Sequence, residues 1–358
     1  MSKKNYIIPI FVPHKGCPHD CIFCNQKMIT GQIQELSSKD IDNIISQYIR
    51  TINKPDVNIE VAFFGGSFTA IPREEQDMYL SVASRYLKMG KIDSIRLSTR
   101  PDYINMEILE NLKKFGVSIV ELGVQSMDEE VLHVCQRGHN TEDIINAVNL
   151  LKEEGFTVGI QLMVGLPKDN EEKCIHTIKK VVELKPNIAR IYPCLVIKDT
   201  YMERMFKSGI YTPLKLNEAV SICKKMLIYL ESNGVNVIRI GLQPTDDMQI
   251  GKNIIAGPYH PAFRQLVESE VYKDMIDEIL DSIVLKPNTS VIINFNSKDY
   301  SNIVGQKKSN IEYFKTKYPA VEINFFANDS ITTDCIIANI GESRFILSKK
   351  DYYRNISL

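Results

Sequence analysis

The sequence predicts an α/β fold in which six parallel strands, each followed by a helix, form a (β/α)6 partial TIM barrel with a small C-terminal α/β appendage. Two observations predict this fold. Six apolar runs of strand length occur between Ile7 and Leu195, and segments with apolar residues at helical spacing separate them. Strands that alternate with helices pair in parallel through right-handed crossovers, which place the helices outside. A full barrel needs eight such units, so this one is expected to stay open on one side.

The predicted elements of the barrel follow one another in order. Strands are expected at Ile7–Val12, Val57–Phe64, Ile92–Ser98, Ile119–Val124, Thr157–Val164 and Ile188–Leu195. Helices are expected around Ile41–Ile49, at Pro72–Met89, Met106–Phe115, up to Val134, at Thr141–Glu154 and at Glu171–Leu184. Ser37 is expected to cap the first helix, and Gly155 to end the helix before the fifth strand. Parallel barrels keep their chemistry where the strands end, so side chains following these strands are candidates for a site.

The pattern changes after the sixth strand. A loop rich in Tyr, Lys and Gly precedes a helix at Leu216–Glu231, and the apolar run Val235–Ile240 is expected to pack alongside the barrel. Beyond Gly257 the expected elements are Ala262–Leu280, Ser290–Phe295, Asn310–Lys317, Ala320–Phe326 and Cys335–Ile340. We therefore predict two domains, at 1–257 and at 258–358.

Composition narrows the class of protein. The chain has 358 residues, eight cysteines and a formal net charge of −1. No secretory signal or regular cysteine framework is visible, which favours the cytoplasm, where thiols stay reduced. No run of about 18 apolar residues predicts a membrane span, so no membrane partner is expected. A net charge near zero neither supports nor excludes an RNA partner.

Three cysteines, Cys17, Cys21 and Cys24, follow the first predicted strand with the spacing Cys-x3-Cys-x2-Cys. A structural zinc site needs four ligands, and no partner pair follows these three. Three thiolates can instead hold three irons of a [4Fe-4S] cluster and leave the fourth iron open to a small molecule. The alternative is a chance cluster of three cysteines in a loop.

This cysteine spacing, with the aromatic Phe23 before the last cysteine, resembles the radical S-adenosylmethionine (SAM) superfamily. Further motifs resemble the radical SAM domain of the Elongator catalytic subunit and its relatives, which modify the wobble uridine of tRNA. In sequence order they are Phe63-Phe64-Gly65-Gly66-Ser67-Phe68, Thr99-Arg100-Pro101-Asp102, Val120-Glu121-Leu122-Gly123-Val124-Gln125-Ser126, Arg137-Gly138-His139 and Ile191-Tyr192-Pro193-Cys194-Leu195-Val196-Ile197. The resemblance runs from about Pro13 to Pro244. Oxygen-independent coproporphyrinogen III oxidase is a more distant likeness.

The resemblance implies a cofactor set and residues that hold it. A [4Fe-4S] cluster on the three cysteines would chelate S-adenosyl-L-methionine and cleave it reductively to a 5′-deoxyadenosyl radical. The expected cofactor-binding residues are Phe23, Gly65, Gly66, Ser67, Ser98, Arg100, Gln125, Arg137 and Gln161. Gln161 matches a SAM ribose contact of the coproporphyrinogen oxidase family. The alternative is that the Gly-Gly pair is a structural turn and that the polar residues are ordinary surface groups.

Two departures from the Elongator pattern limit the expected reaction. The segment after Gly257 lacks the length and the glycine-rich loop of an acetyltransferase domain, and Ser98 stands where the family has a glutamate. We expect a cytoplasmic radical SAM enzyme that acts on RNA, with tRNA and a donor such as ferredoxin or flavodoxin as partners. The alternatives are an enzyme for a small metabolite such as a tetrapyrrole, and a non-catalytic Fe-S subunit. Cys194, at the end of the sixth strand, is a further candidate as hydrogen donor or second-cluster ligand.

Overall fold

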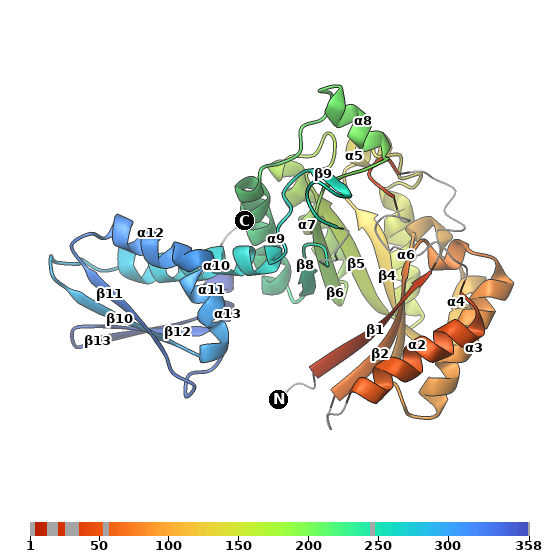
Figure 1. The fold of residues 1–358 in the computed structure, drawn as a ribbon, viewed down its shortest axis with the longest axis horizontal. Coiled ribbons are helices and arrows are strands. Elements are labelled where there is room, and N and C mark those ends of the chain that lie inside the picture. The colour runs from red at the N-terminus through yellow and green to blue at the C-terminus, as the bar shows by residue number, and fades with distance from the viewer. Residues whose placement is uncertain (1–3, 13–20, 26–35, 53–56, 244–247, 357–358) are drawn as a thin grey trace.

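The computed structural model describes residues 4–12, 21–25, 36–52, 57–243 and 248–356. A seven-stranded parallel sheet forms the N-terminal part, in the order β1-β2-β3-β4-β5-β6-β8. Its strands are β1 (Lys4–Val12), β2 (Val57–Gly65), β3 (Ser94–Thr99), β4 (Val117–Gln125), β5 (Thr157–Val164), β6 (Ile188–Pro193) and β8 (Asn236–Ile240). Figure 1 shows the sheet curled into a half-barrel with its helices on the outer side. The predicted α/β half-barrel is therefore confirmed.

Alternation along the strands separates two faces of this sheet. On β4, Val120, Leu122 and Val124 belong to the hydrophobic core beneath the helices. Successive side chains of a strand point to opposite faces, so Glu121 and Gly123 lie on the concave face. The outer face holds the apolar core of the fold, and the concave face is left for polar groups.

The helices cover the outer face of the sheet. Their bounds are α2 (Ser38–Thr51), α3 (Arg73–Lys88), α4 (Met106–Lys114), α5 (Glu129–Val134), α6 (Thr141–Glu153), α7 (Glu171–Leu184) and α9 (Leu216–Ser232). Side-chain caps fix several of their starts: Ser37 and Asp40 form a capping box on α2, Asn140 and Asp143 form one on α6, and Asn170 caps α7. Within the described residues no helix is long and apolar enough to cross a membrane.

The structure corrects the predicted strand count from six to seven. The segment Asn236–Ile240, expected only to pack alongside the barrel, pairs in parallel with β6 as β8. The loop expected after the sixth strand also contains structure: a short helix, α8 (Tyr201–Lys207), and the pair β7 (Val196–Ile197) and β9 (Ile254–Ala256). Each of these pieces is too short to give a clear periodic signal in the sequence.

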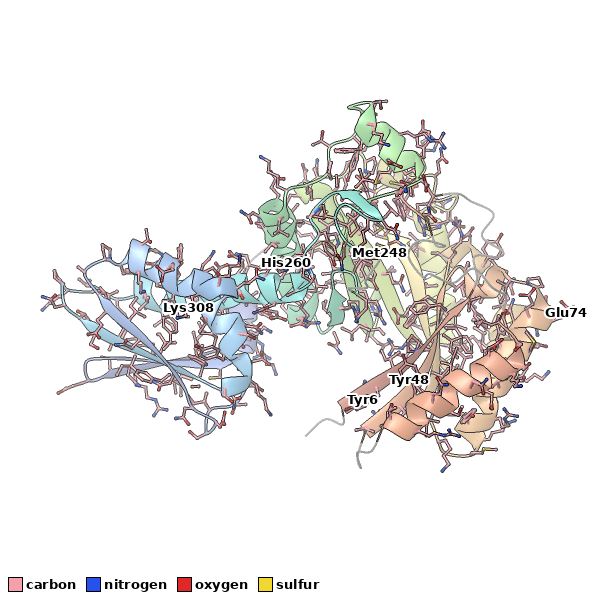
Figure 2. The ribbon with its side chains drawn as sticks, viewed as in Figure 1. Tyr6, Tyr48, Glu74, Met248, His260 and Lys308 are labelled. Atoms are coloured by element: carbon pink, nitrogen blue, oxygen red, sulfur yellow. The ribbon has the colours of Figure 1, made fainter. Side chains whose placement is uncertain are left out.

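A second, smaller sheet lies in the C-terminal part. Its strand order is β11-β10-β12-β13, with β10 (Ser290–Phe295), β11 (Glu322–Ala327), β12 (Cys335–Ile340) and β13 (Ser343–Ser348). The helices are α10 (Phe263–Asp281), α11 (Tyr300–Val304), α12 (Ser309–Lys317) and α13 (Lys349–Asn355). Strand β13 and helices α11 and α13 were not expected from the sequence. The side-chain view places His260 where the chain enters α10 and Lys308 at the start of α12 (Figure 2).

Helix α10 joins the two parts of the molecule. It contacts α9 and β8 on the half-barrel side, and α11, α13 and β13 on the side of the smaller sheet. The boundary predicted after residue 257 falls just before this helix and stays a prediction.

Candidate functional site

The described part of the cysteine loop, residues 21–25, lies at the carboxyl-terminal rim of the half-barrel strands. Cys21 is buried and Cys24 is partly exposed, and the N–H of Cys24 donates to the carbonyl of Cys21 at 2.9 Å in a tight turn. Cys17 lies outside the described residues. The two described cysteines are held in one turn, as a shared cluster requires.

Backbone hydrogen bonds fix this turn to the surrounding elements. The N–H of Ile22 donates to the carbonyl of Cys135 at 3.4 Å, and the N–H of Met202 donates to the carbonyl of Ile22 at 2.8 Å. The Ile22 side chain is buried in a small apolar cluster with Cys135, Cys194 and Met202. Because α5 ends and α8 begins here, both short helices position the cysteine turn.

Arg137 is brought to the cysteine turn from the segment after α5. Its Nη1 donates to the Sγ of Cys21 at 3.0 Å, and its Nη2 donates to the carbonyl of Gly123 at 2.5 Å. Its guanidinium carbon lies 5.9 Å from the centre of the Phe23 ring. In the part of the chain that the structure describes, its buried Nε has no hydrogen-bond partner. A buried cation with a spare donor beside a cysteine sulfur fits both an anionic cluster and a ligand that carries a carboxylate.

Arg100 is oriented differently from Arg137. Its guanidinium forms a bidentate pair with Asp102 at 2.9 and 2.8 Å, and it donates to the backbone carbonyl of Arg137 at 2.5 Å. Burial acts to raise the pKa of Asp102, but contacts with His139 and Arg100 lower it to about 2. Arg100 therefore already has an anionic partner and supports the segment that carries Arg137. Its predicted contact with SAM stays a prediction.

The Gly-Gly motif lies at the end of β2. Gly65 has a φ of 115°, and a Cβ there would lie 2.5 Å from the carbonyl oxygen of Val12. This glycine therefore lets β1 and β2 approach just before the cysteine loop, which is a structural requirement. The Ser67 hydroxyl lies 2.9 Å from the Thr99 hydroxyl and accepts from the N–H of Arg100 at 3.3 Å. Gly66 next to them is partly exposed at the rim.

Two other predicted residues meet on the concave face. The Nε2 of Gln161, on β5, donates to the Ser98 hydroxyl at 3.0 Å and to Oε2 of Glu121 at 3.1 Å. Gln125 ends β4 with a φ of 70°, a left-handed conformation that is uncommon outside glycine and that turns the chain at the rim. These three predicted residues thus come from three neighbouring strands.

A buried ionic network, which sequence reasoning missed, forms the base of the concave face. Arg96 contacts Glu60 at 2.6 Å and Glu121 at 2.8 Å. Arg190 contacts the same Glu121 carboxylate at 2.5 and 3.0 Å. Burial opposes ionisation of Glu121, yet the two arginines lower its pKa. The sequence feature that could have predicted this network is the presence of charged residues at alternate positions of otherwise apolar strands.

Gly159 gives this network its space. A Cβ at Gly159, on β5, would lie 2.8 Å from the Cγ of Glu121. Only glycine therefore admits the Glu121 side chain between β4 and β5.

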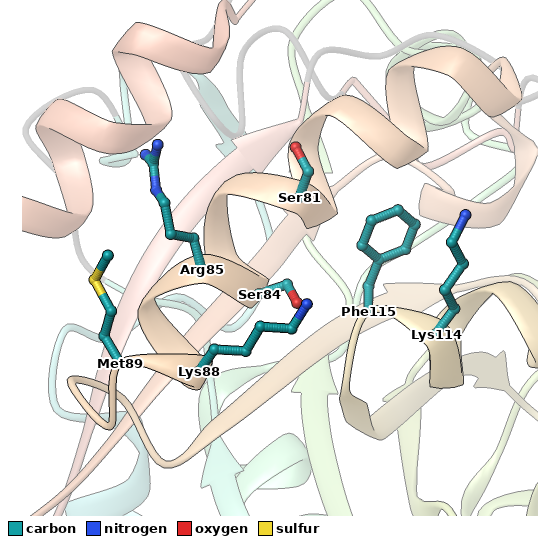
Figure 3. A pocket seen from close by; sticks show the side chains of 7 residues that line it. All are labelled: Ser81, Ser84, Arg85, Lys88, Met89, Lys114 and Phe115. Atoms are coloured by element: carbon teal, nitrogen blue, oxygen red, sulfur yellow. The ribbon is translucent and has the colours of Figure 1, made fainter.

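One surface pocket lies elsewhere, on the outer helical layer. It is lined by residues near the carboxyl ends of α3 and α4: Ser81, Ser84, Arg85, Lys88, Met89, Lys114 and Phe115 (Figure 3). It lies on the opposite side of the sheet from the network described above, and none of the predicted site residues lines it.

Family models match most of the half-barrel. The radical SAM superfamily model matches residues 11–181, and the model of the radical SAM C-terminal domain matches residues 186–273. The chain belongs to the radical SAM superfamily. It is therefore an enzyme whose cofactors are a [4Fe-4S] cluster and S-adenosylmethionine.

Curated relatives match between about half and two thirds of this chain. A tRNA uridine(34) acetyltransferase of Methanocaldococcus jannaschii is 30% identical over 256 residues, which cover 60% of this chain and 47% of that protein. Human Elongator complex protein 3 is 28% identical over 189 residues, which cover 47% of this chain and 35% of that protein. An uncharacterized protein of M. jannaschii is 29% identical over 239 residues, which cover 64% of this chain and 73% of that protein. The chain thus spans about half the length of the acetyltransferases it matches.

Two solved structures are similar to this chain. The structure of Methanocaldococcus infernus Elp3 with residues 1–46 deleted matches with a TM-score of 0.62 and 25% identity, covering 78% of this chain and 64% of that chain. Coproporphyrinogen III oxidase (HemN) from Escherichia coli matches with a TM-score of 0.47 and 17% identity, covering 94% of this chain and 67% of that chain. The archaeal structure supports the half-barrel assignment.

Proposed function

We propose that this radical SAM enzyme acts on RNA and that its substrate is a uridine of tRNA. The observation that carries the proposal is the 30% identity, over 60% of the chain, to a protein named tRNA uridine(34) acetyltransferase. The motifs at Gly65, Arg100, Gln125 and Arg137 fall within residues 11–181, which the superfamily model matches. The proposal covers radical formation and RNA binding, and leaves acetyl transfer aside because the chain spans about half the length of the acetyltransferases it matches.

The cofactors are assigned to residues at the rim. Cys17, Cys21 and Cys24 are proposed to hold the cluster. Phe23, Gly65, Gly66, Ser67, Ser98, Arg100, Gln125, Arg137 and Gln161 are proposed to surround SAM. Of the two rim arginines, Arg137 is the better candidate for the SAM carboxylate, since its buried Nε has no partner among the described residues while Arg100 is paired with Asp102.

The division of work between cofactor and protein follows from this arrangement. When bound, the cofactors supply a carbon-centred radical that abstracts a hydrogen atom from the substrate. The residues of the chain bind and orient SAM at the rim. The concave face below holds the substrate away from water. On that face Arg96 and Arg190 are paired with Glu60 and Glu121, so these four charges balance one another.

Anaerobic reconstitution with iron, sulfide, SAM and a strong reductant tests the enzyme. We expect 5′-deoxyadenosine to form and tRNA to raise its rate. If protein with an intact cluster forms no 5′-deoxyadenosine, the result would favour a non-catalytic Fe-S subunit.

Binding of tRNA across a salt series tests the substrate. Phosphate contacts give a steep fall in affinity with salt, so we expect a clear slope of log affinity against log salt. A flat response, or no binding, would contradict an RNA substrate and favour a small metabolite such as a tetrapyrrole.

A further inference from the structure

Two arginines stand side by side on the last two strands of the half-barrel. Arg190 on β6 is the register partner of Arg239 on β8. The next pair in the register, Ile191 and Ile240, belongs to the core on the outer face of the sheet. Successive side chains of a strand point to opposite faces, so Arg190 and Arg239 lie on the concave face. Like charges at neighbouring positions of a sheet repel each other and destabilise the pairing unless an anion lies between or beside them.

The carboxylates of the concave face neutralise only part of this charge. Glu60 and Glu121 pair with Arg96 and Arg190. Among residues 4–12, 21–25, 36–52, 57–243 and 248–356, no carboxylate forms an ion pair with Arg239. Three arginines thus face two carboxylates, and the excess positive charge is at Arg239.

Burial makes this excess charge costly. Arg239 is partly buried, and the loss of water around its guanidinium lowers its pKa, although the neighbouring Tyr192 and Glu121 act to raise it. Another cation, Arg264, lies nearby and donates to the carbonyl of Val237 at 2.9 Å on the same strand. A cation that loses its water and gains no ion-pair partner destabilises the folded state. An anion that binds beside Arg239 offsets this cost, so the unpaired guanidinium favours anion binding.

The position of β8 suits a ligand that arrives from outside. In the sheet order, β1 and β8 are the two edge strands, so the open side of the half-barrel lies between them. Arg239 therefore lies beside the opening, while Arg96 and Glu121 lie on the inner strands β3 and β4.

We propose that Arg239, with Arg190 beside it, binds a phosphate group of the nucleotide that enters the half-barrel. This inference rests on the proposed RNA substrate and names the part of it that the concave face holds. A guanidinium offers parallel N–H donors that match two phosphate oxygens. The phosphate neutralises the excess charge of the network and fixes the nucleotide below the rim where SAM is held.

Binding of uridine 5′-monophosphate and of uridine to the reconstituted full-length protein, measured by isothermal titration calorimetry, tests the site. We expect the wild type to bind the monophosphate about tenfold or more tighter than the nucleoside, since a hydrogen bond to a charged group contributes about 1.5–3 kcal/mol. Arg239→Gln should bring this ratio close to one, and Arg239→Lys should keep part of it. Arg344→Gln, which removes a cation from exposed β13, should leave the ratio unchanged.

The outcomes separate this inference from the proposed function. A wild type without preference for the monophosphate, or an Arg239→Gln protein that folds normally by circular dichroism and keeps the preference, would overturn the phosphate site. A phosphate preference that depends on Arg239 in a protein that does not bind tRNA would instead overturn the RNA substrate and leave a free nucleotide as ligand. A uridine-containing trinucleotide that binds more tightly than the monophosphate supports a phosphate within RNA.

Discussion

The guanidinium of Arg137 donates a hydrogen bond to the Sγ of Cys21 across 3.0 Å, although 116 residues separate the two in sequence. The segment after α5 is thereby tied to the loop after β1. A second bond from Arg137, to the carbonyl of Gly123, ties both to the end of β4. One cation thus connects the cysteine turn with the rim where Gln125 lies.

Replacing Arg137 by Lys is expected to weaken SAM binding about tenfold or more and to leave the iron content unchanged. Lysine keeps the charge but cannot reproduce the planar set of donors that a carboxylate and the Gly123 carbonyl require. Calorimetric titration of SAM and iron analysis measure the two effects. Unchanged SAM affinity would remove Arg137 from the cofactor contacts.

Replacing Cys21 by Ala is expected to abolish both iron binding and formation of 5′-deoxyadenosine. Two remaining cysteines leave a second iron without a protein ligand. Cys135→Ala is the matched control, because Cys135 is a buried cysteine whose carbonyl accepts from the N–H of Ile22, and it is outside the predicted ligand set. The control should keep the visible absorbance of the cluster. Brown Cys21→Ala protein with normal iron would contradict the cluster assignment.

Replacing Glu121 by Gln is expected to lower the free energy of unfolding by about 3–5 kcal/mol, because it leaves two buried arginines without their shared anion. Urea denaturation monitored by circular dichroism measures this change. Glu107→Gln is the control, since that side chain is 86% exposed and lies 3.8 Å from Arg73. Surface changes of this kind alter stability by about 0.5 kcal/mol or less. Equal effects of the two substitutions would show that the network does not stabilise the fold.

The stability of the protein is expected to fall as pH rises from about 4.5 to about 7 through the ionisation of Glu231. Burial raises the pKa of this carboxyl to about 7, whereas it ionises near 4.5 in an unfolded chain. A raised pKa means that the folded state holds the proton more tightly, so the contribution is present at low pH and lost as the group ionises. Glu231→Gln should flatten this part of the profile in urea denaturation series at several pH values. An unchanged profile in that variant would exclude Glu231 as the cause.

The sequence predicted the regular part of the fold closely and the edge of the sheet poorly. The bounds of β5, α7, β10 and β12 agree with the structure, because each has a clear apolar period between turn residues. Strand β8 has five residues and contains Arg239, so neither its length nor its polarity indicated membership in the sheet. Pairing with β6 decides its place, and such long-range pairing leaves no local signal.

The candidate site was predictable in its positions and not in its contacts. Gln125 lies at the rim because it ends β4 and parallel strands end together, and Arg137 reaches the same rim from the segment after α5. The pairing of Arg100 with Asp102, and the network around Glu121, depend on which side chains meet across strands. Cys194 illustrates the same point: predicted at the barrel mouth, it is buried with its Sγ 3.6 Å from the Sδ of Met202, and burial raises its thiol pKa to about 12.

Helix α10 packs against both the smaller sheet and the half-barrel. Its first residue, Phe263, abuts Gly241 just after β8, where an added Cβ would lie 2.8 Å from the Cβ of Phe263. In the sheet, β8 is an edge strand and pairs with β6 only. A macromolecule bound to the C-terminal part would therefore act on the half-barrel through α10, at α9 and at the strand that carries Arg239.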